Sequence, residues 1–230
     1  MLTLDDAVVA NGTFSLAANF SIPEGSILAV IGPSGAGKST LISGIAGFCA
    51  VTKGCITWAG NDITALSPGH RPISMLFQDN NLFPHLTVAQ NIGLGMRPDL
   101  KLDGVQHRRG AEALVRVGLE GLAERKPGAL SGGQQSRAAL ARVLVQNEPL
   151  ILLDEPFAAL GPALRVEMLN LVAALAKESG ATVLMVSHAP SDARQIADQI
   201  ILVADGVAHP PVATAELLDN PPAALRDYLG

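Results

Sequence analysis

Residues 27–46 read ILAVIGPSGAGKSTLISGIA, and this stretch decides the fold. Its first five residues are apolar and rich in β-branched side chains, which is typical of a buried parallel strand. From Lys38 onward the apolar residues recur at helical spacing. Between the strand and the helix, Gly32, Gly37, Lys38 and Ser39 fit the pattern GxxxxGK[ST] of a phosphate-binding loop.

The chemistry of such a loop follows from its residue types. Glycines leave backbone N–H groups free to surround a polyphosphate, and the start of the following helix adds its positive dipole end. The Lys38 amine would reach the β- and γ-phosphates, and the Ser39 hydroxyl would be a ligand of Mg²⁺. A glycine-rich turn that binds nothing is the alternative, but the flanking strand and helix favour the binding loop. The loop alone leaves many classes of nucleotide-hydrolysing protein open.

Composition and charge exclude several other classes of protein. The 230 residues are 48% hydrophobic and 16% charged, a globular composition with ample material for a core. No apolar run approaches the roughly 18 residues of a membrane span. The start, MLTLDDAVVA, has no basic cluster, so we expect neither a signal peptide nor a transit peptide. The net charge of −5 argues against a nucleic-acid surface.

The two cysteines, Cys49 and Cys55, have no second ligand pair for zinc, and a disulfide is not expected in the cytosol. We expect them to be small core residues on either side of a turn at Lys53 and Gly54.

The order of predicted elements indicates an α/β core. Asn11-Gly12 predicts a hairpin that joins residues 2–9 to residues 14–22. Later strands alternate with helices, which implies parallel strands joined by crossover helices. The other strands are expected at 54–58, 73–77, 150–153, 182–186 and 200–203, the helices of this part at 162–177 and 191–197, and a tail helix at 214–229, interrupted by Pro221-Pro222.

Residues 79–145 differ from the rest of the chain, because the elements predicted there are all helices. Thr87 caps the segment VAQNIGLG, and the further helices are expected at 105–117, at 119–124 and from Ser131 to Val145. We interpret this segment as a helical subdomain inserted into one domain, residues 1–230.

Two more stretches contain residues suited to phosphate chemistry. The strand at 150–153 is followed by Asp154 and Glu155, which places two carboxylates at the sheet edge where phosphate-loop proteins bind ligands. Asp154 suits Mg²⁺, through a water, and Glu155 suits a general base for an attacking water. The segment LSGGQ (130–134) opens a helix at Ser131. This is either a capped helix start without a ligand or a second anion site, which in a head-to-tail dimer would cover the γ-phosphate on the other subunit.

These motifs resemble, over nearly the whole chain, those of the ATP-binding subunit of ABC transporters. GPSGAGKST matches the Walker A motif, LILLDE the Walker B motif and LSGGQ the family signature. By this resemblance Gln78 lies in the Q-loop and His188 is the switch histidine. The nucleotide-binding residues that the resemblance implies are Gly32, Pro33, Ser34, Gly35, Ala36, Gly37, Lys38, Ser39, Thr40, Ser131, Gly132, Gly133 and Gln134. The implied catalytic residues are Glu155, His188 and Gln78, and the implied ligands of Mg²⁺, which accompanies ATP as substrate, are Ser39, Gln78 and Asp154.

The resemblance also implies the fold, the activity and the partners. The fold would be a P-loop NTPase core with an antiparallel β element and a helical subdomain, and the activity would be ATP hydrolysis that powers a membrane importer. The partners would be a second copy of the chain, a transmembrane permease and, indirectly, a periplasmic solute-binding protein, with no nucleic acid. The location would be peripheral, on the cytoplasmic face of the bacterial inner membrane. The permease would contact a groove at residues 78–94, where Phe83 and Leu86 are either contact residues or core residues.

Within the family, residues 70–102 are most similar to the members that serve thiamine importers. Iron(III) or another small solute is the alternative substrate. The alternative functions are a soluble ABC-type ATPase that acts on macromolecular assemblies and a weakly hydrolysing nucleotide-binding module.

Three positions depart from the family's pattern. Asn11 lies about where a tyrosine stacks on adenine, and Phe14 is the nearest aromatic substitute. Gly161 replaces an aspartate that links the two sites of the dimer. Ser136 takes the middle position of Gln135-Ser136-Arg137, where the family often has glutamine. We therefore expect weak stacking on adenine and a hydrolysis rate that depends on Gly161.

Overall fold

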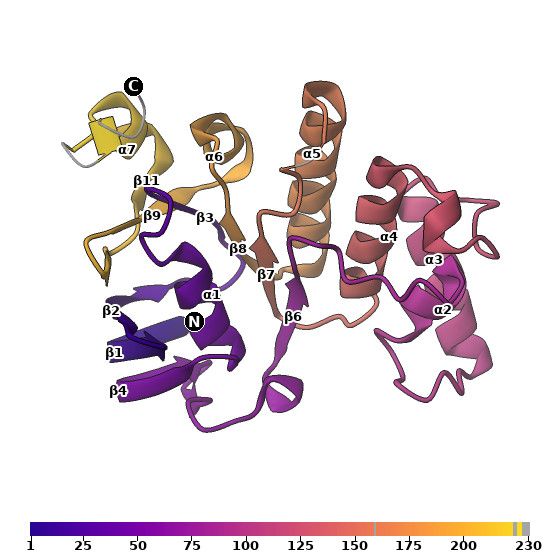
Figure 1. Ribbon diagram of the computed structural model, residues 1–230, viewed down its shortest axis with the longest axis horizontal. Helices are drawn as coiled ribbons and strands as arrows, with labels where there is room; N and C mark the ends of the chain where they lie inside the picture. The colour runs from indigo at the N-terminus through magenta and orange to yellow at the C-terminus, as the bar shows by residue number, and fades with distance from the viewer. Residues whose placement is uncertain (159, 223–224, 227–230) are drawn as a thin grey trace.

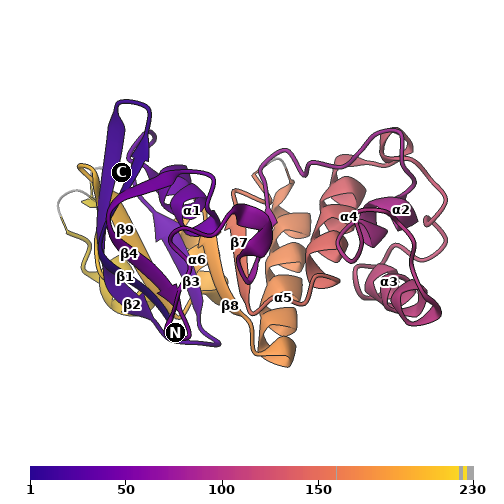
Figure 2. The same ribbon diagram turned by 90° about the horizontal axis from the view of Figure 1, so that it is seen from below.

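The computed structural model describes residues 1–158, 160–222 and 225–226. The strands and some of the helices gather at one end of the molecule and a group of helices lies at the other, with a long helix between them (Figures 1 and 2). In chain order the elements are β1 (Leu2–Asn11), β2 (Phe14–Ile22), β3 (Ile27–Ile31), α1 (Lys38–Ala46), β4 (Ala50–Trp58), β5 (Asn61–Asp62), β6 (Ile73–Leu76), α2 (Val88–Gly93), α3 (Gly104–Arg116), α4 (Gly132–Leu144), β7 (Leu150–Asp154), α5 (Pro162–Ser179), β8 (Thr182–Val186), α6 (Pro190–Ile196), β9 (Gln199–Ala204), β10 (Val207–Ala208), β11 (Val212–Ala213) and α7 (Thr214–Asp219).

A parallel block of strands forms one half of the sheet, in the order β9-β3-β8-β7-β6, with β6 at the edge. All five residues of β3 are buried, as are all five of β8, which explains their continuous apolar sequences. Helix α5 connects β7 to β8, and α6 connects β8 to β9. The predicted alternation of parallel strands and crossover helices is confirmed.

An antiparallel block continues the same sheet. The predicted hairpin is confirmed, because β1 pairs antiparallel with β2, and β1 also pairs with β4 on its other side. Strand β10 joins the two blocks, since it pairs with β2 and with β9. The sequence analysis missed β10 and β11, each of which is two residues long and too short to show a period.

Strand β4 is longer than predicted, and the expected turn at Lys53 and Gly54 was wrong. Both residues lie inside β4, opposite an irregularity in β1. Gly54 has a φ of +70°, and a Cβ there would lie 2.2 Å from the Asp5 carbonyl oxygen, so glycine marks a bulge rather than a turn. Cys49 and Cys55 are half-buried free thiols, so their assignment to the core was also wrong.

The helices α2, α3 and α4 lie together at the end opposite the antiparallel strands (Figures 1 and 2). Thr87, Asp103 and Ser131 each form a reciprocal capping box, which explains where these helices begin. The helix expected at 119–124 was wrong: this segment forms turns, with positive φ angles at Gly118 and Gly121. Those glycines break the segment before a helix can nucleate. The division into one domain with a helical subdomain at 79–145 stays a prediction.

Helix α7 covers the first part of the tail predicted to be helical at 214–229, the chain is not helical at Pro221-Pro222, and residues 225–226 are helical again. Residues 223–224 and 227–230 of that prediction lie outside the described residues. Across the described chain, no helix combines the length and the apolar character needed to cross a membrane.

Arg71 ties the carboxyl end of α1 to the chain that follows β5. Its side chain is 5% exposed, and its Nη1 donates to the carbonyl oxygens of Gly44 (2.9 Å) and Ile45 (2.6 Å). Its Nη2 and Nε donate to the carbonyl oxygens of Thr64 and Leu66. Burial lowers the pKa of this guanidinium, partly opposed by Asp62. One side chain thus satisfies carbonyls that the end of α1 leaves unpaired.

Replacing Arg71 with methionine should lower the free energy of unfolding by about 2–4 kcal/mol. The substitution keeps the apolar stem but leaves buried carbonyls without donors, and hydrogen bonds to a charged group contribute about 1.5–3 kcal/mol each. Urea unfolding measures the loss. Arg97→Met is the matched control, because Arg97 pairs with Asp99 on the surface and its loss should change stability far less. Equal effects of the two variants would contradict this role of Arg71.

Candidate functional site

The loop between β3 and α1 can follow its path only because of two glycines. A Cβ at Gly32 would lie 2.0 Å from the carbonyl oxygen of Val203, in the neighbouring strand β9. Gly37, which precedes α1 with a φ of +108°, faces the ring of Phe14 at a distance that excludes a Cβ. The glycines of the motif therefore allow close packing as well as leaving backbone N–H groups accessible.

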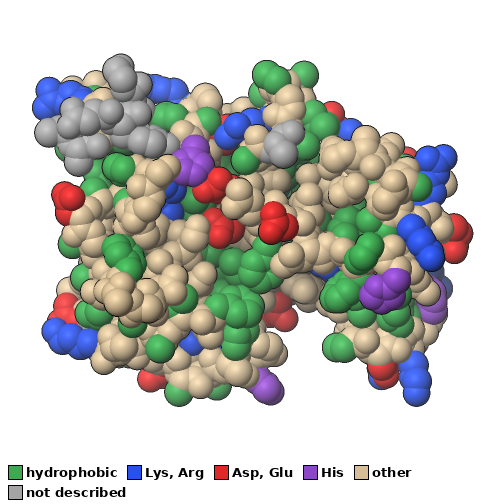
Figure 3. All heavy atoms as spheres, in the orientation of Figure 1, with side chains coloured by type: hydrophobic (Ala, Val, Ile, Leu, Met, Phe, Trp, Pro, Cys, Tyr) green, Lys and Arg blue, Asp and Glu red, His purple; other side chains and the backbone are tan. Residues whose placement is uncertain are grey.

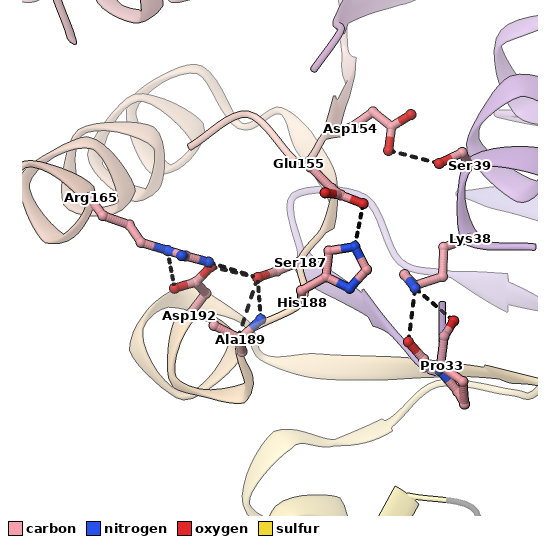
Figure 4. Close-up of polar contacts among 11 residues, drawn as sticks. Pro33, Lys38, Ser39, Asp154, Glu155, Arg165, Ser187, His188, Ala189 and Asp192 are labelled. Carbon is pink, nitrogen blue, oxygen red and sulfur yellow. Dashed lines mark hydrogen bonds and ion pairs between the residues drawn. The ribbon is translucent and has the colours of Figure 1, made fainter. Parts of the chain in front are cut away.

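Lys38 is the first residue of α1 and is 5% exposed. Its Nζ donates to the carbonyl oxygens of Gly32 (2.8 Å) and Pro33 (2.9 Å), as Figure 4 shows. Burial lowers the pKa of this amine, and the carboxylates of Glu155 and Asp154 oppose that shift. The amine is thus held inside the loop, close to where a bound phosphate would replace its carbonyl partners.

Ser39 and Asp154 come together from α1 and the end of β7. The Ser39 hydroxyl donates to Asp154 Oδ1 at 3.2 Å. Burial raises the pKa of Asp154, as does repulsion from Glu155, whereas the Ser39 hydrogen bond, Lys38 and His188 lower it. A hydroxyl and a carboxylate are oxygen ligands of the kind that Mg²⁺ prefers, so this pair fits the ion. Among the described residues no group of three or more His, Cys, Asp and Glu is arranged to hold a metal ion.

Glu155 and His188 lie side by side, just beyond the carboxyl ends of the adjacent strands β7 and β8. Glu155 Oε1 is 2.6 Å from His188 Nε2 (Figure 4). The Glu155 N–H donates to the Val186 carbonyl oxygen at 3.3 Å. The φ of Glu155 is +48°, a strained value for a residue with a side chain. With this backbone conformation the Glu155 side chain faces His188 at the carboxyl ends of β7 and β8.

A hollow of about 520 Å³ lies among these groups, and Lys38, Ser39, Glu155 and His188 line it, whereas Asp154 is not part of the lining. Its lining comes from the loop and α1, from Glu155 and His188, and from the hairpin at Asn11 and Phe14. Acidic side chains gather beside a histidine near the centre of the face in Figure 3. Phe14 contacts the loop at Gly37, so it is both a wall of the hollow and a packing residue. The hollow brings together Asn11, Phe14, Ser34, Gly35, Gly37, Lys38, Ser39, Thr40, Glu155 and His188.

Other predicted site residues lie outside this hollow. Ser131 and Gln134 begin α4, where the Ser131 hydroxyl accepts from the Gln134 N–H and the Gln134 side chain accepts from the Ser131 N–H. A Cβ at Gly133 would lie 2.3 Å from Leu164 Cδ2, so this glycine permits contact between α4 and α5. Gln78 lies in the turn after β6 and also does not line the hollow. One chain therefore assembles only part of the predicted site.

Gly161 precedes α5 at its N-cap position, and no side chain of the described residues caps that helix. A Cβ at Gly161 would meet no described atom within 4 Å. An aspartate would therefore fit, whereas glycine supplies neither a side-chain cap nor a negative charge.

Sequence reasoning missed a cluster beside His188, formed by Arg165, Ser187 and Asp192. Its members come from three separate elements, and no local spacing connects Arg165 with Asp192. Only the three-dimensional arrangement shows that they meet.

The parallel sheet, the glycine loop and the buried lysine define a P-loop nucleotide-binding protein. The chain belongs to the ABC transporter family, whose sequence pattern matches residues 16–158. It is 60% identical over 230 residues to the thiamine import ATP-binding protein ThiQ of Ruegeria sp. (strain TM1040), with all of both chains covered.

Two solved structures share the fold. A nucleotide-free ATP-binding cassette from an ABC transporter superposes with a TM-score of 0.87 at 27% identity, covering 100% of this chain and 99% of its own. A dimeric ATP-binding cassette in a post-hydrolysis state, bound to ADP and Pi, superposes with a TM-score of 0.81 at 31% identity, covering 93% and 99%. The predicted α/β fold of an ABC ATPase is confirmed.

Replacing Asp154 with asparagine should stabilise the nucleotide-free protein at pH 7 and weaken its Mg²⁺-dependent binding of ATP. Because the native pKa of Asp154 is raised, the unfolded chain ionises first as pH rises, and stability falls through the window between the two pKa values. The asparagine removes this penalty, so we expect the Tm of the nucleotide-free protein to rise.

Thermal unfolding at pH 7 and near pH 4, with and without MgATP, measures both effects. Near pH 4 the stabilisation should shrink, because there Asp154 is protonated in the native state and in about half of the unfolded chains as well. An equal stabilisation of wild type and variant by MgATP would contradict the role of Asp154.

Proposed function

We propose that the chain is the ATP-hydrolysing subunit of a membrane importer that carries thiamine. The hollow with Lys38, the Ser39–Asp154 pair and the Glu155–His188 pair supports the activity. The relative named for thiamine import, 60% identical over the full length, supports the solute.

The loop from Gly32 to Thr40 binds the phosphates through its N–H groups, and Lys38 turns its amine from the loop carbonyls to the β- and γ-phosphates. Ser39, Asp154 and Gln78 would hold Mg²⁺, which neutralises charge on the phosphate oxygens when it is bound. Glu155 accepts a proton from the attacking water, and His188 holds Glu155 and the γ-phosphate in line. The 2.6 Å contact between Glu155 and His188 supports this division of roles.

The second half of the site comes from another copy of the chain. Ser131, Gly132, Gly133 and Gln134 lie outside the hollow of their own chain, so they are available to cover the γ-phosphate that a partner copy binds. The dimeric relative bound to ADP and Pi supports a dimer of this kind.

The permease would bind beside Gln78, at residues 78–94. Phe83 is 46% exposed there, whereas Leu86 is half-buried, so Phe83 is the stronger contact residue of the two. We further propose a single domain with the helical subdomain at 79–145, a peripheral location on the cytoplasmic face of the inner membrane, and an indirect link to a periplasmic solute-binding protein.

Replacing Glu155 with glutamine should trap an ATP-bound dimer. Glutamine keeps the size of the side chain but cannot accept the proton of the attacking water, so ATP stays intact between the two copies. Size-exclusion chromatography with saturating MgATP should show the dimer, and hydrolysis should fall by at least about 100-fold. The double variant Lys38→Ala, Glu155→Gln is the control, since it should lose ATP binding and stay monomeric. A monomeric Glu155→Gln protein at saturating MgATP would contradict the dimeric site.

Thiamine transport can be tested in a bacterium whose own thiamine importer lacks its ATP-binding subunit. The chain, expressed with the permease and binding protein that purify with it from its own organism, should restore uptake of radiolabelled thiamine, and the Lys38→Ala chain should not. Restored uptake of iron(III) or another solute without uptake of thiamine would contradict the proposed substrate while leaving the ATPase role intact.

A further inference from the structure

A polar cluster lies behind His188, where the first turns of α5 and α6 meet. Arg165 Nε donates to Asp192 Oδ1 at 2.8 Å, and Arg165 Nη2 donates to the other carboxylate oxygen. The Ser187 hydroxyl donates to Asp192 Oδ2 at 2.5 Å and accepts from Arg165 Nη2 at 3.3 Å. Figure 4 shows the three side chains turned toward one another, next to His188.

Burial makes this cluster sensitive to the loss of any member. Asp192 is 5% exposed and Ser187 is 3% exposed. A carboxylate at this depth is costly without a cation, and the planar guanidinium of Arg165 satisfies both of its oxygens. The pair therefore fixes α5 against α6.

The backbone is held on both sides of His188. The Ser187 N–H donates to the Val30 carbonyl oxygen at 3.2 Å, which anchors the segment to β3. The Ala189 N–H donates to the Ser187 hydroxyl at 3.0 Å, and the Asp192 N–H donates to the Ala189 carbonyl oxygen at 3.0 Å. His188 is thus presented to Glu155 by a short segment that the cluster keeps in place.

The cluster also connects the two chain segments that carry the Glu155–His188 pair. Arg165 belongs to the helix that follows Glu155, and Asp192 belongs to the helix that follows His188. A hollow of about 220 Å³ lies between these segments, and Glu155, Arg165, His188 and Asp192 all line it. The residues of the polar cluster contact Val30, Ala189 and one another. Lys38 and Ser39, which belong to the phosphate-binding motif, have other partners.

We propose that Arg165, Asp192 and Ser187 are positioning residues that hold His188 against Glu155 during ATP hydrolysis. The inference rests on the proposed ATPase function and deepens it. Because the cluster supports the reacting pair rather than the phosphate-binding loop, it sets the rate of hydrolysis and not the affinity for ATP.

The test compares kcat with the Kd for ATP in the full chain. Asp192→Asn keeps the shape of the side chain but removes the ion pair, and Ser187→Ala removes only the hydroxyl. Each should lower kcat by about 10- to 100-fold, the effect of a misplaced reacting group, while Kd changes by less than about twofold. Arg194→Ala is the matched control on the same helix, because its ion pair with Asp219 is exposed and its loss should leave kcat within about twofold of wild type.

Arg165→Ala adds a chemical readout that a purely structural role would not produce. Millimolar guanidinium chloride should restore part of its kcat by filling the enlarged hollow and pairing with Asp192, whereas equal sodium chloride or urea should not. Thermal unfolding of each variant shows whether it is folded under the assay conditions.

Three results would overturn the proposal. The first is a wild-type kcat in Asp192→Asn and Ser187→Ala. The second is a joint fall of kcat, ATP affinity and Tm without rescue by guanidinium. The third is a wild-type chain that hydrolyses no ATP, which would overturn the proposed function as well; the first two leave that function standing.

Discussion

The close approach of Gly32 to β9 is the constraint on which the rest of the structure depends. Strand β3 pairs with β9 up to Ile31 and Leu202, and a Cβ on the next residue would meet the Val203 carbonyl oxygen at 2.0 Å. The chain can therefore turn away from the sheet only without a side chain at this point. That turn starts the loop, and the loop determines where α1 begins and where Lys38 is buried.

The parallel sheet then brings the remaining charges to the same place. The carboxyl ends of β7 and β8 lie beside that of β3 and present Asp154, Glu155 and His188 to the loop. Each reactive group has an internal partner: Lys38 binds loop carbonyls, Ser39 binds Asp154, and Glu155 contacts His188. The raised pKa of Asp154 and the positive φ of Glu155 show that this arrangement opposes stability, as expected where function determines the residues.

Features set by neighbouring residues in the sequence were predictable, and features set by distant contacts were not. The loop, the apolar strands and the capping boxes at Thr87 and Ser131 have local signatures, so sequence reasoning found them. Gly54 was misread, because a bulge and a turn both favour glycine and only the pairing with β1 distinguishes them. The contact between Arg165 and Asp192 has no local signature, and the sequence indicated neither residue.

Helix α5 explains how the two parts of the candidate site are related within one chain. Leu164 packs against Gly133, at the start of α4, so closely that any Cβ on Gly133 would displace it. The next residue, Arg165, holds Asp192 and Ser187 beside His188. Packed helices shift as units rather than deforming continuously. The Ser131–Gln134 turn and the pair formed by His188 and Glu155 therefore have α5 as a common neighbour, the turn through Leu164 and the pair through Arg165. The turn that would cover a nucleotide on another subunit thus packs on the same helix that supports the reacting groups of its own.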